Sequence, residues 1–277
     1  MEHQSLIKKL RTDRGISQEK LAQGISRRST LASFERQATK ISYDMLVQYL
    51  DRMNITLEEY QFLLDDGNLS EKRGISVLFY QKLTKEYDAA FSDMLFQKYN
   101  ETGESYYQLL RSEYLLVMKK DNRDLVIDEA KEKQVLSAYL DAIEDWGRFE
   151  LAIFINTLFC FDDDYILMHF KRSVKKMKGY IDNLYYSRDI LAFLINGVVL
   201  GFERKSKQLF DVFFPELRFF ADELKSMEAD ITWRVFQFLS TDDIYSNKKK
   251  YELFFILEYL GKEEYISYIE KNLPTSD

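Results

Sequence analysis

Two adjacent arginines, Arg27 and Arg28, stand where a short helix is predicted to begin. The polar positions that follow are Ser29, Thr30 and Ser33. Arginine can pair with both acceptors of a guanine base, and hydroxyl side chains bond to bases and phosphates. We therefore expect this stretch to bind double-stranded DNA, with Arg28 as the first choice for direct base contact.

Other polar residues near this stretch are expected to support the contact. The arginines suited to backbone phosphates are Arg11, Arg14 and Arg36. Gln18 can donate to a phosphate or support a side chain of the following helix. Glu35 is expected to form an ion pair with an arginine rather than to touch DNA. Each arginine taken singly could instead be a solvated surface charge.

These side chains need two short helices joined by a tight turn. Residues 17–36 carry that pattern, which is typical of a helix-turn-helix whose second helix enters the major groove. Gly15 is a stop signal for the helix before it, and Ser17, Ser42 and Thr56 are suited to cap later helices. Five short helices are therefore predicted in an N-terminal domain.

The chain is predicted to contain an N-terminal domain over 1–66, a linker over 67–74 and a C-terminal domain over 75–277. Glycine, asparagine and charged residues mark the linker. Beyond it, apolar residues recur at helical spacing, without the alternation typical of strands. The predicted fold class is all-α, with further helices over 75–86, 88–100, 104–119, 127–145, 148–161, 163–179, 184–202, 206–224, 227–240, 243–260 and 262–272.

Charge is unevenly distributed along the chain. The net charge is −7, but residues 1–40 hold nine lysines and arginines against four acidic residues, a net of +5. The remainder therefore carries −12. A basic N-terminal domain attracts phosphates, whereas an acidic remainder would repel DNA and confine contact to that domain. An ordinary acidic surface explains the C-terminal charge equally well.

The sequence also argues against export and membrane insertion. The single Cys160 gives no disulfide framework and suits a reducing compartment. The N-terminal residues lack the apolar segment of a secretory signal. The longest apolar stretch, 190–202, has 13 residues, whereas a membrane-spanning helix needs about 20. We expect a cytoplasmic protein without membrane contact.

No set of residues suggests catalysis or a cofactor. His3 and His169 lie far apart and Cys160 has no partner, so zinc-ligand spacing is lacking. The sequence has no glycine-rich phosphate loop. The acidic run 162–164 is better explained as the cap of a following helix than as a metal site. We expect neither an enzyme nor a bound metal or cofactor.

An internal repeat lies in the C-terminal domain. Residues 148–156 and 188–196 share five identities in nine positions at a spacing of 40, and a weaker copy begins near Ile231. Each copy precedes a second helix, so the unit is a helical hairpin of the length found in tetratricopeptide (TPR) and HEAT arrays. The repeat predicts a TPR-like solenoid with a concave binding surface.

The N-terminal motif resembles the XRE-type helix-turn-helix, and the whole chain resembles the Rgg/GadR/MutR family of bacterial transcription regulators. The likeness rests on Ser-Gln at 17–18, Leu-Ala at 21–22, Phe-Glu-Arg at 34–36, Ile-Ser at 41–42, Asn-Ile-Thr-Leu-Glu-Glu-Tyr at 54–60, Trp146 and the segment 150–156. Gln37 departs from the glycine usual in the family. If position 37 is left-handed, glutamine costs on the order of 1 kcal/mol there.

The resemblance implies a homodimer whose C-terminal domain binds a short hydrophobic signalling peptide and controls the DNA-binding domain. Dimerisation also follows from the few contacts that a single domain can make, because two half-sites about 34 Å apart multiply the affinity. The expected partners are promoter DNA, the peptide and a second copy of the chain.

The repeat offers side chains suited to such a peptide. Asn156 and Asn196 share one register and would form a ladder on the concave face, where amides supply the donors and acceptors that a peptide backbone needs. Arg148 and Arg188 could bind a carboxylate. The expected apolar walls are Phe159, Tyr185, Trp233 and Phe236.

Other interpretations remain open at this point. The asparagines could bond between repeats, and the aromatic residues could fill the core. The whole protein could be an interaction scaffold, or a regulator whose C-terminal domain only dimerises.

Overall fold

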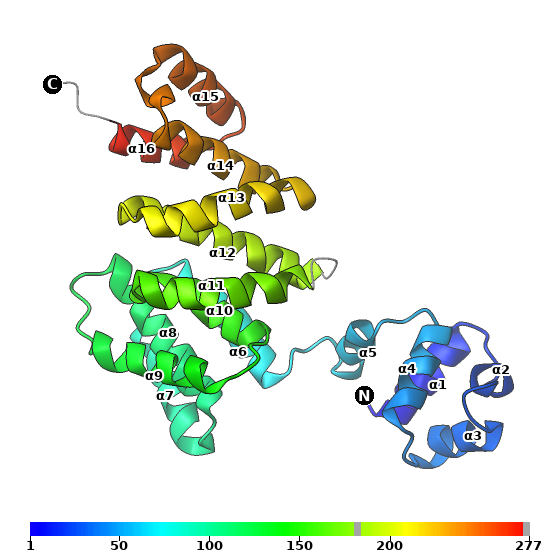
Figure 1. The fold of residues 1–277 in the computed structure, drawn as a ribbon. Coiled ribbons are helices and arrows are strands. Elements are labelled where there is room, and N and C mark those ends of the chain that lie inside the picture. Colours follow the sequence, from blue (N-terminus) through cyan, green and yellow to red (C-terminus); the bar gives the residue numbers. More distant parts are fainter. Residues whose placement is uncertain (180–183, 274–277) are drawn as a thin grey trace. The chain divides into compact units, whose positions relative to one another are not determined.

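The computed structural model describes residues 1–179 and 184–273, and every regular element in these two ranges is a helix (Figure 1). The all-α prediction is confirmed. The chain divides into two compact units, Met1–Lys85 and Glu86–Asp277. This division lies beyond the linker expected at 67–74, because α6 (Glu71–Leu83) begins inside that segment and belongs to the first unit.

The first unit is built from short helices with the expected caps. Before α6 these are α1 (His3–Asp13), α2 (Gln18–Ala22), α3 (Arg28–Gln37), α4 (Tyr43–Arg52) and α5 (Leu57–Leu64). Ser17, Ser42 and Thr56 each accept a hydrogen bond from the backbone N–H three residues further on, as predicted. Their apolar faces enclose one core, which includes Leu6, Ile7, Leu21, Leu31 and Tyr49.

The end of α3 differs from expectation. Ala38 takes the left-handed conformation, with φ 52° and ψ 33°, and Gln37 remains helical. The backbone strain considered for Gln37 therefore falls on Ala38.

The second unit consists of longer helices. They are α7 (Ala89–Thr102), α8 (Ser105–Asp121), α9 (Glu129–Ala142), α10 (Arg148–Asn156), α11 (Asp163–Lys178), α12 (Leu184–Glu203), α13 (Lys207–Glu223), α14 (Met227–Ser240), α15 (Asn247–Tyr259) and α16 (Glu263–Asn272), with short 3₁₀ turns η1 (Leu158–Cys160) and η2 (Asp242–Tyr245). Two of the expected helices are interrupted. The segment 148–161 breaks at Thr157, whose hydroxyl donates to the Ile153 carbonyl at 2.7 Å. The segment 243–260 restarts at Asn247, where Ser246 caps α15.

The even-numbered helices from α8 to α16 form a continuous row in which each packs against the next (Figure 1). The odd-numbered helices α9 to α15 each contact members of that row. This is the stack of helical hairpins that the repeat predicts. Asn156 and Asn196 consequently lie on neighbouring members of the row, α10 and α12.

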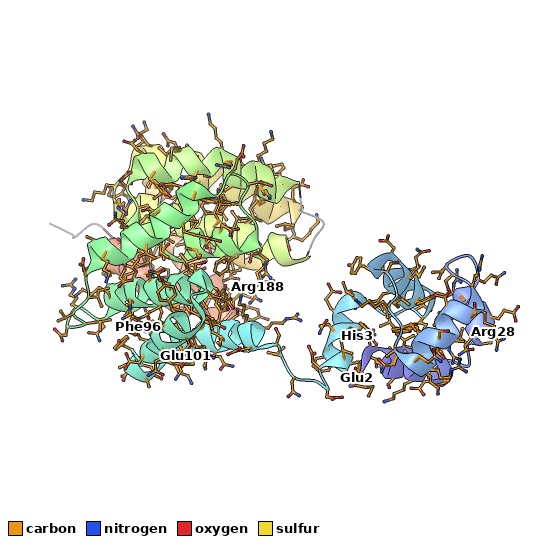
Figure 2. The ribbon with its side chains drawn as sticks, turned by 90° about the horizontal axis from the view of Figure 1, so that it is seen from below. Glu2, His3, Arg28, Phe96, Glu101 and Arg188 are labelled. Atoms are coloured by element: carbon orange, nitrogen blue, oxygen red, sulfur yellow. The ribbon has the colours of Figure 1, made fainter. Side chains whose placement is uncertain are left out.

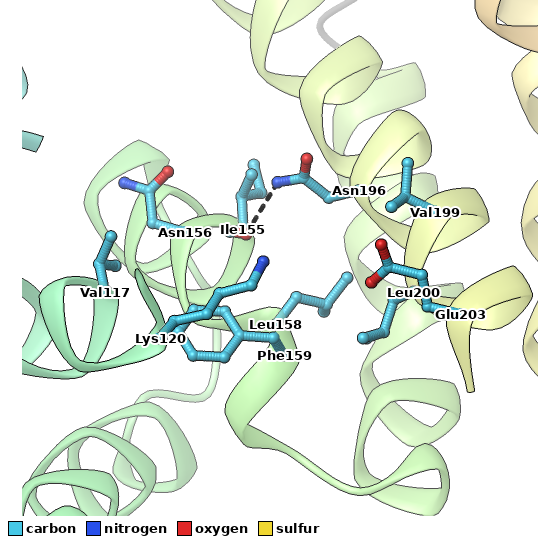
Figure 3. A pocket seen from close by; sticks show the side chains of 10 residues that line it. All are labelled: Val117, Lys120, Ile155, Asn156, Leu158, Phe159, Asn196, Val199, Leu200 and Glu203. Carbon is cyan, nitrogen blue, oxygen red and sulfur yellow. Dashed lines mark hydrogen bonds between the residues drawn. The ribbon is translucent and has the colours of Figure 1, made fainter. Parts of the chain in front are cut away.

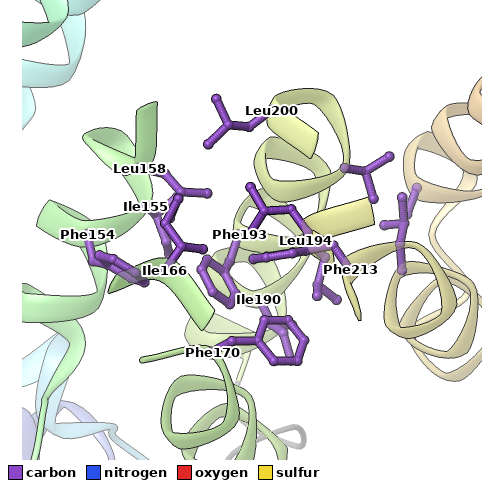
Figure 4. Close-up of a cluster of buried hydrophobic side chains, with 14 of the residues drawn as sticks. Phe154, Ile155, Leu158, Ile166, Phe170, Ile190, Phe193, Leu194, Leu200 and Phe213 are labelled. Carbon is purple, nitrogen blue, oxygen red and sulfur yellow. The ribbon is translucent and has the colours of Figure 1, made fainter. Parts of the chain in front are cut away.

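A large apolar core fixes these helices relative to one another. Phe154, Phe193 and Phe213 meet within it, with ring centroids 5.7 Å and 5.1 Å apart along the series (Figure 4). A Cβ atom on Gly197 would lie 2.0 Å from the Phe213 ring, so α12 and α13 approach closely enough to require glycine there. The core thereby fixes the helix that carries Asn196.

Candidate DNA-binding surface and ligand pocket

A buried carboxylate joins the first three helices. Glu35 on α3 accepts hydrogen bonds from Arg11 Nε at 2.6 Å and Nη2 at 2.8 Å, and from Gln18 Nε2 at 2.8 Å. Burial raises the pKa of Glu35, but the bonds from Arg11 and Gln18 outweigh that effect and hold the pKa below its usual value. The carboxylate therefore stays ionised and sets how α3 lies against α1 and α2.

This network corrects one expectation and resolves two others. The guanidinium of Arg11 is buried and also donates to the Ile16 carbonyl, so Arg11 is not free to bind a phosphate. Gln18 supports a side chain of the following helix, which was one of its two expected roles. Glu35 forms the expected ion pair with an arginine.

Two further arginines stabilise the ends of helices. Arg14 donates to the backbone carbonyls of Met53 and Leu10, at 2.9 and 3.2 Å, which reduces its freedom to reach a phosphate. Arg52 donates to three carbonyls at the end of α2, those of Lys20, Leu21 and Gln23. Cations at a helix C-terminus satisfy carbonyls that lack partners inside the helix. No sequence signal indicated the role of Arg52.

The exposed side of α3 carries the remaining expected DNA contacts. Arg27, Ser29 and Arg36 are exposed, as is Arg28, which Figure 2 shows at the surface of the unit. Thr30 and Ser33 are half-buried. Before the helix, Ser26 Oγ and Tyr49 Oη lie 2.7 Å apart and fix the turn against α4. Fixed helices therefore present a cationic, hydroxyl-bearing surface to solvent.

Replacing Glu35 with alanine should lower the unfolding free energy of the first unit by about 3 to 5 kcal/mol, because the buried Arg11 guanidinium loses its anion. Hydrogen exchange of the α1–α3 segment, measured by mass spectrometry, reports on this unit separately. Glu19→Ala removes an exposed carboxylate from α2 and should change that free energy by less than about 0.5 kcal/mol. Equal effects of the two substitutions would contradict the assignment.

The stabilisation by Glu35 should also depend on pH. Because the folded pKa of Glu35 is lowered, its contribution to the unfolding free energy is fully present above the pKa of an unfolded glutamate and is lost as the pH falls through the folded pKa.

The second unit contains a pocket of about 170 Å³ between α8, α10, η1 and α12 (Figure 3). It is lined by Val117, Lys120, Ile155, Asn156, Leu158, Phe159, Asn196, Val199, Leu200 and Glu203. Three residues predicted to bind a peptide, Asn156, Phe159 and Asn196, therefore line one pocket. The ammonium of Lys120 lies 4.9 Å from the centre of the Phe159 ring. The pocket thus combines apolar walls with amides and charges of both signs.

Both pocket asparagines also bond within the protein. Asn156 Nδ2 donates to Glu113 Oε1 at 2.7 Å, and Asn196 Nδ2 donates to the Ile155 carbonyl at 3.2 Å. The carboxyl of Glu113 is fully buried, and burial raises its pKa to about 7, although the bond from Asn156 opposes the rise. The expected bonding between repeats therefore coexists with exposure to the pocket.

Among the described side chains, Arg148, Arg188 and Trp233 were also expected to bind a peptide, but they do not line this pocket. Arg148 donates to Asp189 at 2.7 Å, so a carboxylate already engages its guanidinium. Arg188 is exposed. Trp233 stacks on Phe214, with the guanidinium of Arg218 4.9 Å from its ring.

Phe236 corrects the expectation of an apolar wall. It is 2% exposed and packs against Phe202 and Tyr268 in the core. The side chain of Tyr185 lies outside the described residues. Conversely, sequence reasoning missed Glu113, Lys120 and Glu203. Of these, only Glu113 left a signal, as an acidic residue directly before the apolar run at 114–118.

The described part of the chain shows neither a membrane-spanning helix nor a metal site. None of its helices is long and apolar enough to cross a bilayer. Among the same residues, no group of three His, Cys, Asp or Glu side chains is arranged to hold a metal ion.

Comparison with known protein families shows to which family this chain belongs. The model of the C-terminal domain of the HTH-type transcriptional regulator Rgg matches residues 92–271, and a helix-turn-helix model matches residues 7–60. The chain belongs to the Rgg family. It is a DNA-binding helix-turn-helix regulator of that type.

Solved structures share the fold of this Rgg-family chain. A Listeria monocytogenes EGD-e protein classed as a transcriptional regulator has a TM-score of 0.78 and 17% identity, covering 96% of this chain and 93% of that one. A single-site variant of the SHP pheromone receptor Rgg2 of Streptococcus dysgalactiae has a TM-score of 0.68 and 17% identity, covering 100% of both chains. PrgX in complex with cCF10 has a TM-score of 0.65 and 16% identity, covering 98% of both.

Proposed function

We propose that this regulator is a homodimer whose binding to promoter DNA is controlled by a short hydrophobic peptide held in the pocket of the second unit. The observation that carries the proposal is the meeting of Asn156, Asn196 and Phe159 in one pocket. PrgX, which has the same fold, has been solved with cCF10, and Rgg2 is described as a pheromone receptor. Such a peptide changes DNA affinity only if it binds two states of the protein differently.

The DNA contact is proposed for the exposed face of α3. The residues assigned to it are Arg27, Arg28, Ser29, Thr30, Ser33 and Arg36. Of these, Arg28 is the first residue of the helix, and in a helix-turn-helix the early residues of this helix reach the base edges. Its side chain is exposed and forms no ion pair within the described residues, so it can bond to a guanine.

Arg28→Ala should weaken specific DNA binding by about 1 to 3 kcal/mol and relax the preference for one base pair. Arg36→Ala, at a proposed phosphate contact, should weaken binding to all sequences and reduce the salt slope by about 1. Fluorescence anisotropy measures both, on a duplex selected from random sequences by the purified protein. Arg123→Ala makes the same charge change at an exposed position of the second unit and is the control. Wild-type affinity for Arg28→Ala would exclude it as a base contact.

The pocket suits an extended peptide because it offers hydrogen bonding beside apolar walls. Asn156 is half-buried and Asn196 exposed, so both amides remain accessible to a ligand. Val117, Phe159 and Val199 are half-buried and provide surfaces against which apolar side chains can pack. The same asparagines bond internally, which is what a purely dimerising domain would also need. Only a measured response to a ligand can distinguish peptide control from a domain that only dimerises.

The double variant Asn156→Ala with Asn196→Ala should lose its response to the peptide while retaining wild-type DNA affinity without it. The response is measured as the change in DNA affinity on adding peptide fractions of conditioned culture medium. Asn100→Ala removes an exposed asparagine from α7 and should respond like the wild type. A full response by the double variant would contradict the proposal that the peptide acts through this pocket.

Self-association is proposed for the exposed face of α15. Tyr251, Phe255 and Tyr259 follow one another at intervals of four residues and are 73%, 60% and 84% exposed. The last repeats of a solenoid usually carry a polar outer face, whereas this helix carries three aromatic rings. Clusters of exposed apolar residues mark interaction sites. We assign a second copy of the chain to this face, because a regulator that binds two half-sites must be a dimer.

Phe255→Glu combined with Tyr259→Glu should convert the dimer to a monomer, because two carboxylates would be buried without partners in the interface. Sedimentation velocity measures the change, and DNA affinity should fall with it. Met227→Glu places a carboxylate at another exposed apolar position, on α14, and should leave the dimer intact. If the double variant sediments like the wild type, the dimer interface does not lie on this face of α15.

A further inference from the structure

Glu113 is a buried carboxyl beside the ligand pocket. It lies on α8, is 2% exposed, and is followed by the apolar run at 114–118. Its carboxyl accepts a hydrogen bond from the side chain of Asn156, on α10, which lines the pocket. An ionisable group is costly to bury unless it has a specific partner. Glu113 and Asn156 therefore constrain each other.

The two pocket asparagines are oriented by partners of different chemistry. Asn196 faces the Ile155 carbonyl, which can only accept, so its Nδ2 must point inward and its Oδ1 outward. Asn156 faces the Glu113 carboxyl, which only accepts while it is ionised. In this state the Oδ1 atoms of both asparagines point to the same side (Figure 3). One N–H of each Nδ2 is thus already used, and the Oδ1 of each amide is left free to accept a hydrogen bond.

We infer that Glu113 is a positioning residue of the pocket, holding the Asn156 amide so that its oxygen, rather than its nitrogen, meets the ligand. With Asn196 it creates a pair of acceptors from two successive repeats. Such a pair matches N–H groups that point to the same side of an extended peptide. This last step rests on the proposed peptide function, whereas the orientation of the amide does not.

The orientation of the Asn156 amide depends on the protonation of Glu113. Burial, opposed by the bond from Asn156, places the pKa of Glu113 at about 7. Once protonated, the carboxyl can donate to Asn156 Oδ1, which turns the amide and offers Nδ2 to the pocket. Asn196 cannot follow, because the Ile155 carbonyl never donates. Below this pKa the pocket therefore presents one donor and one acceptor, and it matches two N–H groups less well.

Burial and the bond from Asn156 set the pKa of Glu113. Several charged groups on the helices packed around α8 bond elsewhere: Lys98 of α7 contacts the Tyr107 ring, Glu132 of α9 bonds to Ser112 and Arg111, and Glu150 of α10 bonds to Tyr139. On α8 itself, Lys120 lies over Phe159. Across the pocket, Glu203 of α12 is exposed.

The orientation can be tested without any ligand. In protein labelled with ¹⁵N-asparagine, the side-chain NH₂ signals of Asn156 should shift with a midpoint near pH 7 in the wild type. The shift should disappear in Glu113→Gln, which has nearly the same shape but does not titrate. The Asn196 signals should not move in either protein. Constant Asn156 signals in the wild type, or the same titration in Glu113→Gln, would overturn the inference.

Ligand binding gives a second and independent readout. The probe is an equimolar mixture of synthetic heptapeptides of leucine, isoleucine, valine and phenylalanine, with and without backbone N-methylation. Wild-type affinity for the unmethylated mixture should fall by up to about tenfold for each pH unit below the midpoint. Glu113→Gln should abolish this dependence, whereas Asn196→Ala should weaken binding and keep it.

The two proposals fail in different ways. Absence of peptide binding at every pH would contradict the proposed function and leave the NMR test of Glu113 to decide the orientation. Peptide binding with a flat pH profile in the wild type would contradict the role of Glu113 and leave peptide control standing. Equal affinity for N-methylated peptides would contradict the acceptor pair.

Discussion

A buried carboxylate persists only where donors reach it, and both units of this protein depend on that constraint. In the first unit, Glu35 is satisfied by Arg11 and Gln18, and satisfying it locks α1, α2 and α3 together. In the second, Glu113 is satisfied by Asn156, and satisfying it joins α8 to α10. In each case the acid is buried, yet it determines how an exposed polar surface is arranged.

Local sequence signals predicted the secondary structure well. Ser17, Ser42 and Thr56 act as caps because capping depends on a side chain and a backbone N–H only three residues away. The repeat at a spacing of 40 predicted the stack of hairpins, and with it the neighbouring positions of Asn156 and Asn196. The possibility that Gln37 is left-handed was left open, and the left-handed residue is the next one, Ala38, because several residues near a helix end can adopt that conformation.

Partners distant in the sequence were harder to predict. Periodicity indicates which face of a helix is buried, but not which polar group lies opposite, so Arg11 could not be distinguished from a surface arginine. The same limit explains why Phe159 lines the pocket while Phe236 fills the core, since both are aromatic residues in apolar helices. The pocket depends on how three repeats meet, and no single repeat contains that information.

The break after Asn156 gives α10 an unusual end. A helix continuing through Thr157 would bond the Ile155 carbonyl to the amide of residue 159. Because α10 ends at Asn156, that carbonyl is left without a partner inside the helix, and the side chain of Asn196 donates a hydrogen bond to it. The residue at which one helix ends thus decides the polarity that the next repeat shows to the pocket. Selection acting on the length of α10 could therefore change the polar lining of the pocket while leaving every residue of the pocket unchanged.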